Sequence, residues 1–199
     1  MKKLAMAALA LIAMASAQAQ SQDPATPESK AYLVVAGGAT HLNAECVNGV
    51  SCKTSSTGFK AGAGWNVARN LSVEAGNLSL GSAKASAATG VVSAPIVNLD
   101  LKTEAWYVAG VWTPPSAGNM MWDVKLGVAS VKTTATVTAG SLGSAAASER
   151  KAKVYAGADL GFKVNPNLTI LLGVDVTETE LGGNKYGASM LSLGAKFAF

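Results

Sequence analysis

His41 is the only histidine of the chain, and Cys46 and Cys52 are its only cysteines. Hydrolysis through a serine nucleophile needs a histidine held beside a serine and an acid, but His41 is followed by Leu42 and Asn43, with no serine in step. One histidine and two cysteines also fall short of the ligand set that a metal site needs. We therefore expect no catalytic residue, no metal and no cofactor. For His41 we expect a hydrogen-bonding role at the base of a loop.

The first 19 residues have the pattern of a secretory signal peptide. Lys2 and Lys3 form a positive start, 4–14 is an apolar run rich in alanine, and 17–19 is a small-x-small cleavage site. We expect 1–19 to be removed on export, 20–30 to be a polar N-terminal segment, and 31–199 to form one domain. Without the two leader lysines the 16 basic residues become 14, against 12 acidic ones, and no basic run stands out. This balance gives no sign of nucleic-acid binding.

The two cysteines are separated by five residues that include Asn48-Gly49, a strong turn signal. Export leads to an oxidising compartment, where disulfides form and persist. We therefore predict a disulfide between Cys46 and Cys52. A ring this short restricts few unfolded conformations, so its contribution to stability is below the roughly 3 kcal/mol expected for a 15-residue loop. Such a bond would make the tip of a loop rigid.

The segments around the histidine and the cysteines, and those along the rest of the chain, have apolar residues at every second position, which is typical of β-strands. Eight segments alternate in this way: 31–41, 57–67, 71–81, 97–112, 120–131, 154–164, 168–177 and 190–199. Their connections alternate as well, because 68–70, 114–119 and 165–167 are short and rich in turn residues, whereas 42–56, 82–96, 132–152 and 178–185 are longer. An up-and-down meander with short turns at one end and long loops at the other is the pattern of an outer-membrane barrel.

One face of these segments is apolar and the other is small or charged. The charged face carries Lys102 and a set that we expect to form a paired network inside a barrel: Lys60, Glu74, Glu104, Asp123, Lys125, Asp159, Lys163, Asp175 and Lys196. Opposite charges must pair there, because an unpaired buried ion is costly. The interior of an eight-stranded barrel has room only for side chains, so we predict a plugged lumen.

The direction of the apolar face distinguishes a soluble sandwich from a membrane barrel. Charged residues are only 14% of the chain and hydrophobic residues 49%, whereas soluble domains average about 25% charged residues. Beyond residue 20, no apolar run approaches the roughly 18 residues of a membrane-spanning helix. Aromatic residues gather beside the short turns and the chain end, which favours an interfacial girdle and hence the barrel: Trp65, Trp112, Trp122, Phe162, Phe197 and Phe199.

The segments 57–65, 71–81 and 191–199 resemble the OmpA-like transmembrane domains and the related OmpX-type barrels, and the resemblance covers the mature chain. It implies an eight-stranded antiparallel barrel in the outer membrane of a Gram-negative cell, with both ends, including 20–30, in the periplasm. It also implies that Phe199 is the signal read by the barrel-assembly machinery. Asn77 departs from the family pattern, which usually has a tyrosine there. No wall-binding domain follows Phe199, so we do not carry over a wall-tethering role.

Four functions remain open at this point. The first is a non-catalytic, monomeric anchor that contacts outer-membrane lipid and lipopolysaccharide and displays surface loops. The second is an adhesin that binds a host or surface ligand through its loops, with tips at 82–96 and 136–148, and through strands that project as an exposed sheet around 97–102 and 131–138. The third is a narrow channel through the charged interior, and the fourth is a lipid-modifying enzyme that depends on His41.

Overall fold

The computed structural model describes residues 30–43, 51–87, 97–116, 118–139, 143–181 and 184–199. Alternation of apolar and polar residues produces nine β-strands: β1 (Ala31–Leu42), β2 (Ser51–Lys53), β3 (Ser55–Ala68), β4 (Leu71–Ala87), β5 (Val97–Trp112), β6 (Met120–Ala139), β7 (Ser144–Asn165), β8 (Leu168–Leu181) and β9 (Asn184–Ala198). No helix in these ranges is long and apolar enough to cross a bilayer.

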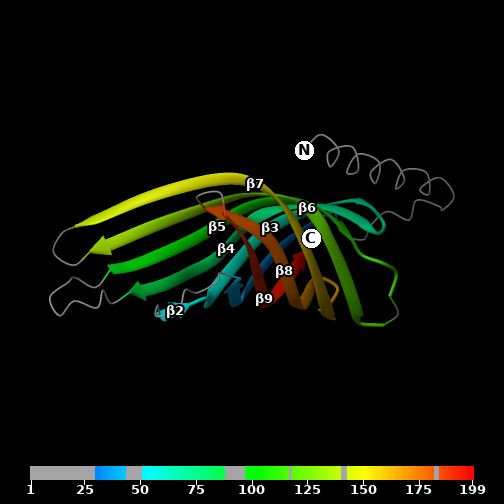
Figure 1. The fold of residues 1–199 in the computed structure, drawn as a ribbon. Coiled ribbons are helices and arrows are strands. Elements are labelled where there is room, and N and C mark those ends of the chain that lie inside the picture. The colour runs from blue at the N-terminus through cyan, green and yellow to red at the C-terminus, as the bar shows by residue number, and fades with distance from the viewer. Residues whose placement is uncertain (1–29, 44–50, 88–96, 117, 140–142, 182–183) are drawn as a thin grey trace.

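Eight of the strands close into a ring of antiparallel neighbours. The order around the sheet is β4-β3-β1-β9-β8-β7-β6-β5, and the pairing of β5 with β4 closes it. The two ends of the domain meet where β1 pairs with β9, since Ala31 and Phe199 exchange backbone hydrogen bonds of 3.3 and 3.0 Å. The short strand β2 lies beside the far end of β4 and extends β3. The fold is therefore the closed eight-stranded barrel that the sequence predicts (Figure 1).

One side of the barrel wall is much taller than the other. β6 and β7 pair from Met120–Phe162 as far as Thr138–Ser144, whereas β7 and β8 stop pairing at Tyr155–Thr177. Figure 1 shows β4 to β7 running beyond the remaining strands as a curved sheet. Strands therefore replace much of what the sequence suggested as long loops at 82–96 and 132–152. This confirms the expectation that the strands continue outward as a projecting sheet.

A bulge marks the point where β4 enters the extended sheet. The register between β4 and β5 shifts between Ser79 and Ser82. Gly81 lies in this gap with a φ of 73°, and a Cβ there would be 2.5 Å from the backbone oxygen of Thr57. Only glycine adopts such a conformation in such a space at low cost. Gly81 therefore bends β4 at the base of the extension.

Inward and outward side chains differ in kind along each strand. Outward positions carry large apolar residues that are 40% exposed or more, including Leu33, Val73, Val108, Leu126, Leu160, Leu172 and Leu193. Inward positions carry buried tyrosines, lysines and carboxylates, with a smaller apolar cluster around Leu78, Leu80 and Met190. The apolar surface thus lies on the outside, and the charged residues form the centre.

Two glycines on facing strands give a test of the packing at the wall. A Cβ at Gly127 would lie 2.0 Å from the backbone oxygen of Val108, whereas a Cβ at Gly110 would meet nothing closer than 3.9 Å. Gly127→Ala must therefore move the backbone, and we expect it to lower the free energy of unfolding by about 1–3 kcal/mol. Gly110→Ala should change it by less than about 0.5 kcal/mol.

The measurement is urea unfolding in detergent micelles, with the heat-dependent shift in SDS gel migration as the check of barrel closure. Equal stability of the two variants would contradict the register of β5 and β6.

Candidate functional site

Glu74 lies at the centre of the barrel interior and is fully buried. Its Oε2 accepts a hydrogen bond of 2.9 Å from the Tyr32 hydroxyl, and its Oε1 accepts one of 2.8 Å from the Tyr107 hydroxyl. Lys125 Nζ donates to both oxygens, at 2.9 and 3.2 Å. Four strands, β1, β4, β5 and β6, thus supply one cluster. Both oxygens are thus hydrogen-bonded, each to one tyrosine and to Lys125, which holds the charge in place.

Lys125 joins this cluster to a second carboxylate. Its Nζ lies 2.8 Å from Asp159 Oδ2 as well as 2.9 Å from Glu74 Oε1. The contact with Asp159 is an ion pair of poor hydrogen-bond geometry, and Oδ2 has no regular hydrogen bond to a described residue. One cation therefore serves two buried carboxylates.

Lys60 and Asp175 form the second strong pair. Lys60 Nζ donates to both carboxylate oxygens of Asp175, at 2.7 and 3.0 Å, and the Tyr155 hydroxyl donates to the same carboxylate. The Tyr155 ring stacks on the ring of Tyr107, with their centroids 4.5 Å apart. This stack connects the Lys60 pair with the Glu74 cluster through aromatic contact.

The third pair lies toward the end that carries the short turns. Lys196 Nζ donates to Asp123 Oδ2 at 2.6 Å, and Thr113 Oγ1 donates to Asp123 Oδ1 at 2.6 Å. The same ammonium lies 4.5 Å from the centre of the Tyr32 ring, within the range of a cation–π contact. Tyr32 therefore links this pair to Glu74.

Together these bonds cross the lumen in several directions. Lys60 on β3 reaches Asp175 on β8, Lys125 on β6 reaches Glu74 on β4, and Lys196 on β9 reaches Asp123 on β6. None of these strand pairs is adjacent in the ring. Within the described interior, three lysines face four carboxylates, and all seven are buried. Chemically, this is an internal set of cross-links between strands that are two or three places apart in the ring.

Two members of the expected interior set lie elsewhere. Glu104 points outward on β5, where it forms a 2.7 Å ion pair with Lys102, and both side chains are exposed. The residues of β5 that point inward are Thr103, Ala105, Tyr107, Ala109 and Val111. The charged residues therefore share a face with Trp106 and Trp112, which corrects the expected phase of this strand.

Lys163 is the second correction. It has the inward phase of β7, but it lies beside the bulge between Lys163 and Asn165 at the end of the strand, and it is exposed. At this position the barrel wall no longer encloses the side chain, so the ammonium reaches water without an internal partner.

Three tyrosines belong to the interior network although the sequence pattern did not single them out. Tyr32, Tyr107 and Tyr155 are 3%, 2% and 0% exposed, and each donates to a buried carboxylate. Each tyrosine is an even number of residues from an inward residue of its own strand, Val34, Val111 or Asp159. This shared phase is the sequence signal that could have placed them in the interior. Tyrosine fits such sites because it combines a large apolar ring with a hydroxyl donor.

The extended sheet holds a separate charged cluster where β7 and β8 are no longer paired. Lys153 donates to Glu180 across this gap, and Lys151 lies 3.1 Å from Glu149 and 3.9 Å from Glu180. The hydrogen bond from Lys153 lowers the pKa of Glu180, and the hydrogen bond to Glu149 raises the pKa of Lys151. Side-chain bonds thus replace the backbone ladder at the base of the extension.

The residues considered for catalysis or metal binding show less organisation. His41 Nδ1 lies 3.3 Å from Ser55 Oγ on the neighbouring strand, in an exposed position, and no described carboxylate is hydrogen-bonded to its ring. No group of three His, Cys, Asp or Glu side chains in the described ranges is arranged to hold a metal ion. Cys46 and the side chain of Cys52 lie outside the described residues, and so does the segment 1–29.

The aromatic residues of the expected girdle all point outward. Trp65, Trp112, Trp122, Phe162, Phe197 and Phe199 are between 43% and 64% exposed. They lie near the short turns and the chain ends, since Trp65 pairs with Ala31, Trp112 with Leu71 and Phe162 with Met120. Trp112 and Trp122 pack edge to face with centroids 5.5 Å apart.

A closed ring of eight antiparallel strands, apolar outside and charged inside, is the geometry expected for a transmembrane barrel. The family model of the outer membrane protein beta-barrel domain matches residues 7–199. The chain belongs to this family. It is an outer-membrane β-barrel that crosses the membrane with eight strands, and its outer apolar wall faces lipid. No curated protein matches the sequence.

Solved outer-membrane barrels have the same fold. Ail of Yersinia pestis, the attachment invasion locus protein, is 16% identical with a TM-score of 0.53. Neisserial surface protein A (NspA) is 14% identical with a TM-score of 0.55, and a major outer membrane protein from Thermus thermophilus is 15% identical with a TM-score of 0.53. Each alignment covers 85% of this chain and 99% of the other. At these identities the likeness shows the fold alone.

The pair of Lys60 and Asp175 allows a test of the interior bonds of this outer-membrane barrel. Lys60→Met leaves a buried carboxylate without its cation, and we expect the free energy of unfolding to fall by about 3–5 kcal/mol. Lys60→Met combined with Asp175→Asn removes both charges and should recover most of that loss. The measurement is urea unfolding in micelles.

Lys102→Met is the matched control, because Lys102 belongs to an exposed ion pair. The free energy of unfolding of this variant should equal that of the wild type. Additive losses in the double variant would contradict a direct interaction between Lys60 and Asp175.

Proposed function

We propose that this protein is a non-catalytic structural component of the outer membrane: a rigid barrel that contributes to membrane integrity and carries an extended sheet at the cell surface. The observation that carries the proposal is the set of ion pairs that cross the lumen between strands that are not neighbours. A lumen occupied by bonded side chains suits an anchor, since every bond stiffens the wall. Its partners on this proposal are the lipid and lipopolysaccharide of the membrane.

Biogenesis adds three proposals from the sequence. We propose that 1–19 is a signal peptide, that Cys46 and Cys52 form a disulfide in the first surface loop, and that Phe199 is recognised by the barrel-assembly machinery. Phe199 is 64% exposed beside the outward Phe197, so its ring lies on the outer wall and is not part of the packed interior.

A second candidate function is binding of a host or surface ligand through the extended sheet. The specific observation in its favour is the length of β6 and β7, which stay paired to Thr138–Ser144 well beyond the end of the β7–β8 ladder. Ail, which has the same fold, is named as an attachment protein, and one structure holds it in complex with the heparin analogue sucrose octasulfate. A paired sheet is a stiff platform on which such contacts could be built.

Trimming the extension separates these two functions. Thr134 and Ser148 face each other in register, so 135–147 can be replaced by Asn-Gly, a two-residue hairpin turn. In cells that lack the protein, the trimmed form should restore resistance of the outer membrane to detergent as well as the wild type does. A control carries the residues of 135–147 in shuffled order.

Adhesion to host cells or matrix is measured on the same strains. If the trimmed form loses adhesion while the outer membrane keeps its resistance to detergent, the result supports ligand binding in addition to the structural role. Failure of the wild type itself to restore detergent resistance would overturn the structural role.

Conductance provides a test against the channel hypothesis. Because Glu74 is held by Tyr32, Tyr107 and Lys125 at the centre of the lumen, we expect planar bilayers with the wild type to carry no stepwise current. Glu74→Ala should stay silent as well, since the neighbouring rings still fill the space. Glu104→Ala, on the outer wall, is the control. Stepwise currents in the wild type that change with Glu74→Ala alone would establish a channel.

A further inference from the structure

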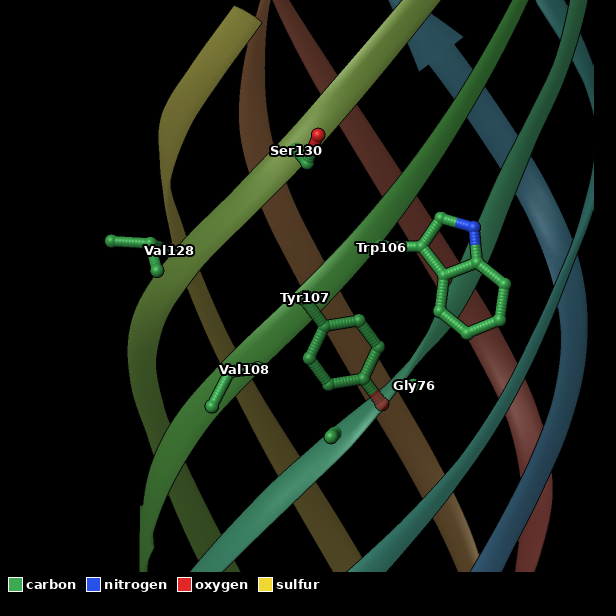
Figure 2. A pocket seen from close by; sticks show the side chains of 7 residues that line it. Gly76, Trp106, Tyr107, Val108, Val128 and Ser130 are labelled. Atoms are coloured by element: carbon green, nitrogen blue, oxygen red, sulfur yellow. The ribbon is translucent and has the colours of Figure 1, made fainter.

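The outer wall has a shallow groove between β4, β5 and β6. It has a volume of about 390 Å³ and is lined by Ala75, Gly76, Trp106, Tyr107, Val108, Val128 and Ser130. Figure 2 shows Trp106, Val108 and Val128 projecting from β5 and β6, with the Tyr107 ring at the level of Gly76. This volume lies within the roughly 300–1,000 Å³ of small-molecule sites. The groove faces lipid, so its ordinary content is an acyl chain.

Small residues on β4 create the depression. Ala75 faces Val108, and Gly76 faces Tyr107, while Asn77 faces Trp106 and donates a 3.3 Å hydrogen bond to the Ala105 carbonyl. Trp106 stands beside this low region with 63% of its surface exposed. The wall therefore offers a raised aromatic edge next to a low apolar floor.

A row of charged residues begins directly above the groove. Trp106 and Ser130 face each other in register. Two residues further along the strands, toward the extended sheet, Glu104 faces Lys132, and Lys132 faces Arg150. Directly opposite residues point to the same side of a sheet, and Lys132 and Arg150 are exposed. The Cα atoms of Ser130 and Lys132 are separated by roughly 7 Å along the strand.

This row has a positive balance. Lys132 and Arg150 supply two cations, against the one carboxylate of Glu104. Glu104 is bonded at 2.7 Å to Lys102, which lies one row further along the strands, opposite Thr134. On β8, the outward residue that follows the apolar Val176 is instead Glu178, also exposed. Lys132 and Arg150 thus lie on the side of the barrel that carries the groove.

We infer that the outer wall of β4 to β7 binds an anionic membrane lipid with a phosphomonoester headgroup, its acyl chain in the groove beside Trp106 and its phosphate against Lys132 and Arg150. The headgroups of an outer-membrane lipid lie where the apolar wall ends, which is the level of this row. Arginine and lysine are the usual phosphate partners, arginine through paired N–H donors. The site goes beyond the structural role, because it selects one lipid by its charge.

Quenching of Trp106 tests the inference. Trp65, Trp112 and Trp122 are changed to Phe, which leaves Trp106 as the only tryptophan, and the folded protein is placed in phosphatidylcholine vesicles. A small fraction of the lipid is brominated phosphatidic acid in one series and brominated phosphatidylcholine in the other. At equal fractions we expect phosphatidic acid to be enriched beside Trp106 roughly 25-fold, since Lys132 and Arg150 each contribute about fivefold.

Matched variants separate the two parts of the site. Lys132→Gln with Arg150→Gln should abolish the preference for phosphatidic acid, whereas Lys151→Gln, on the opposite face of β7, should keep it. Ala75→Leu fills the groove and should weaken quenching by both lipids, whereas Ala158→Leu, elsewhere on the outer wall, should not. The SDS gel shift confirms that each variant is folded. Equal quenching by the two lipids in the unaltered background, or a preference that survives loss of both cations, would overturn the inference.

Discussion

The structure depends on one constraint: in hydrocarbon, every backbone N–H and C=O group must find a partner within the protein. The β4–β5 and β1–β9 pairings meet it by leaving no open edge in the ring. Once the ring is closed, the alternation of side chains follows, because every second residue must face either lipid or the lumen. Apolar residues outside and charged residues inside are thus two results of the same closure.

Closure also creates the need for the interior bonds. A ring of eight strands encloses too little space for free water around each charge, so a lysine placed there requires a carboxylate within reach. Lys60, Lys125 and Lys196 each have one at 2.9 Å or less. The tyrosines complete the arrangement because their hydroxyls satisfy oxygens that the three ammonium groups cannot cover alone. The same bonds that neutralise the lumen also tie together strands that share no backbone hydrogen bonds.

The sequence was sufficient to predict the architecture because a period of two over many residues, joined by turns of alternating length, has few other solutions. It was less reliable within a strand. On β5 the charges of Lys102 and Glu104 suggested an inward face, but Trp106, Val108 and Trp112 have the same phase and lie on the outer wall. Charged and apolar side chains can share the outer face of β5 only if the strand has left the lipid by the time it reaches Glu104. Whether it has done so depends on the length of the strand and not on the local sequence pattern. Pairing across the lumen, such as that of Lys60 with Asp175, was equally out of reach, because it depends on how the ring closes.

The unequal height of the wall leaves one strand edge uncovered. From Ser144 to Val154, β7 pairs with β6 on one side and has no partner on β8 among the described residues. An exposed edge of this length is a template on which a second copy could add a strand and start aggregation. The consecutive charges Glu149, Arg150 and Lys151 lie in the middle of this edge. Burying them against another chain would be costly, so the tall side of the barrel is protected against self-association by its own sequence.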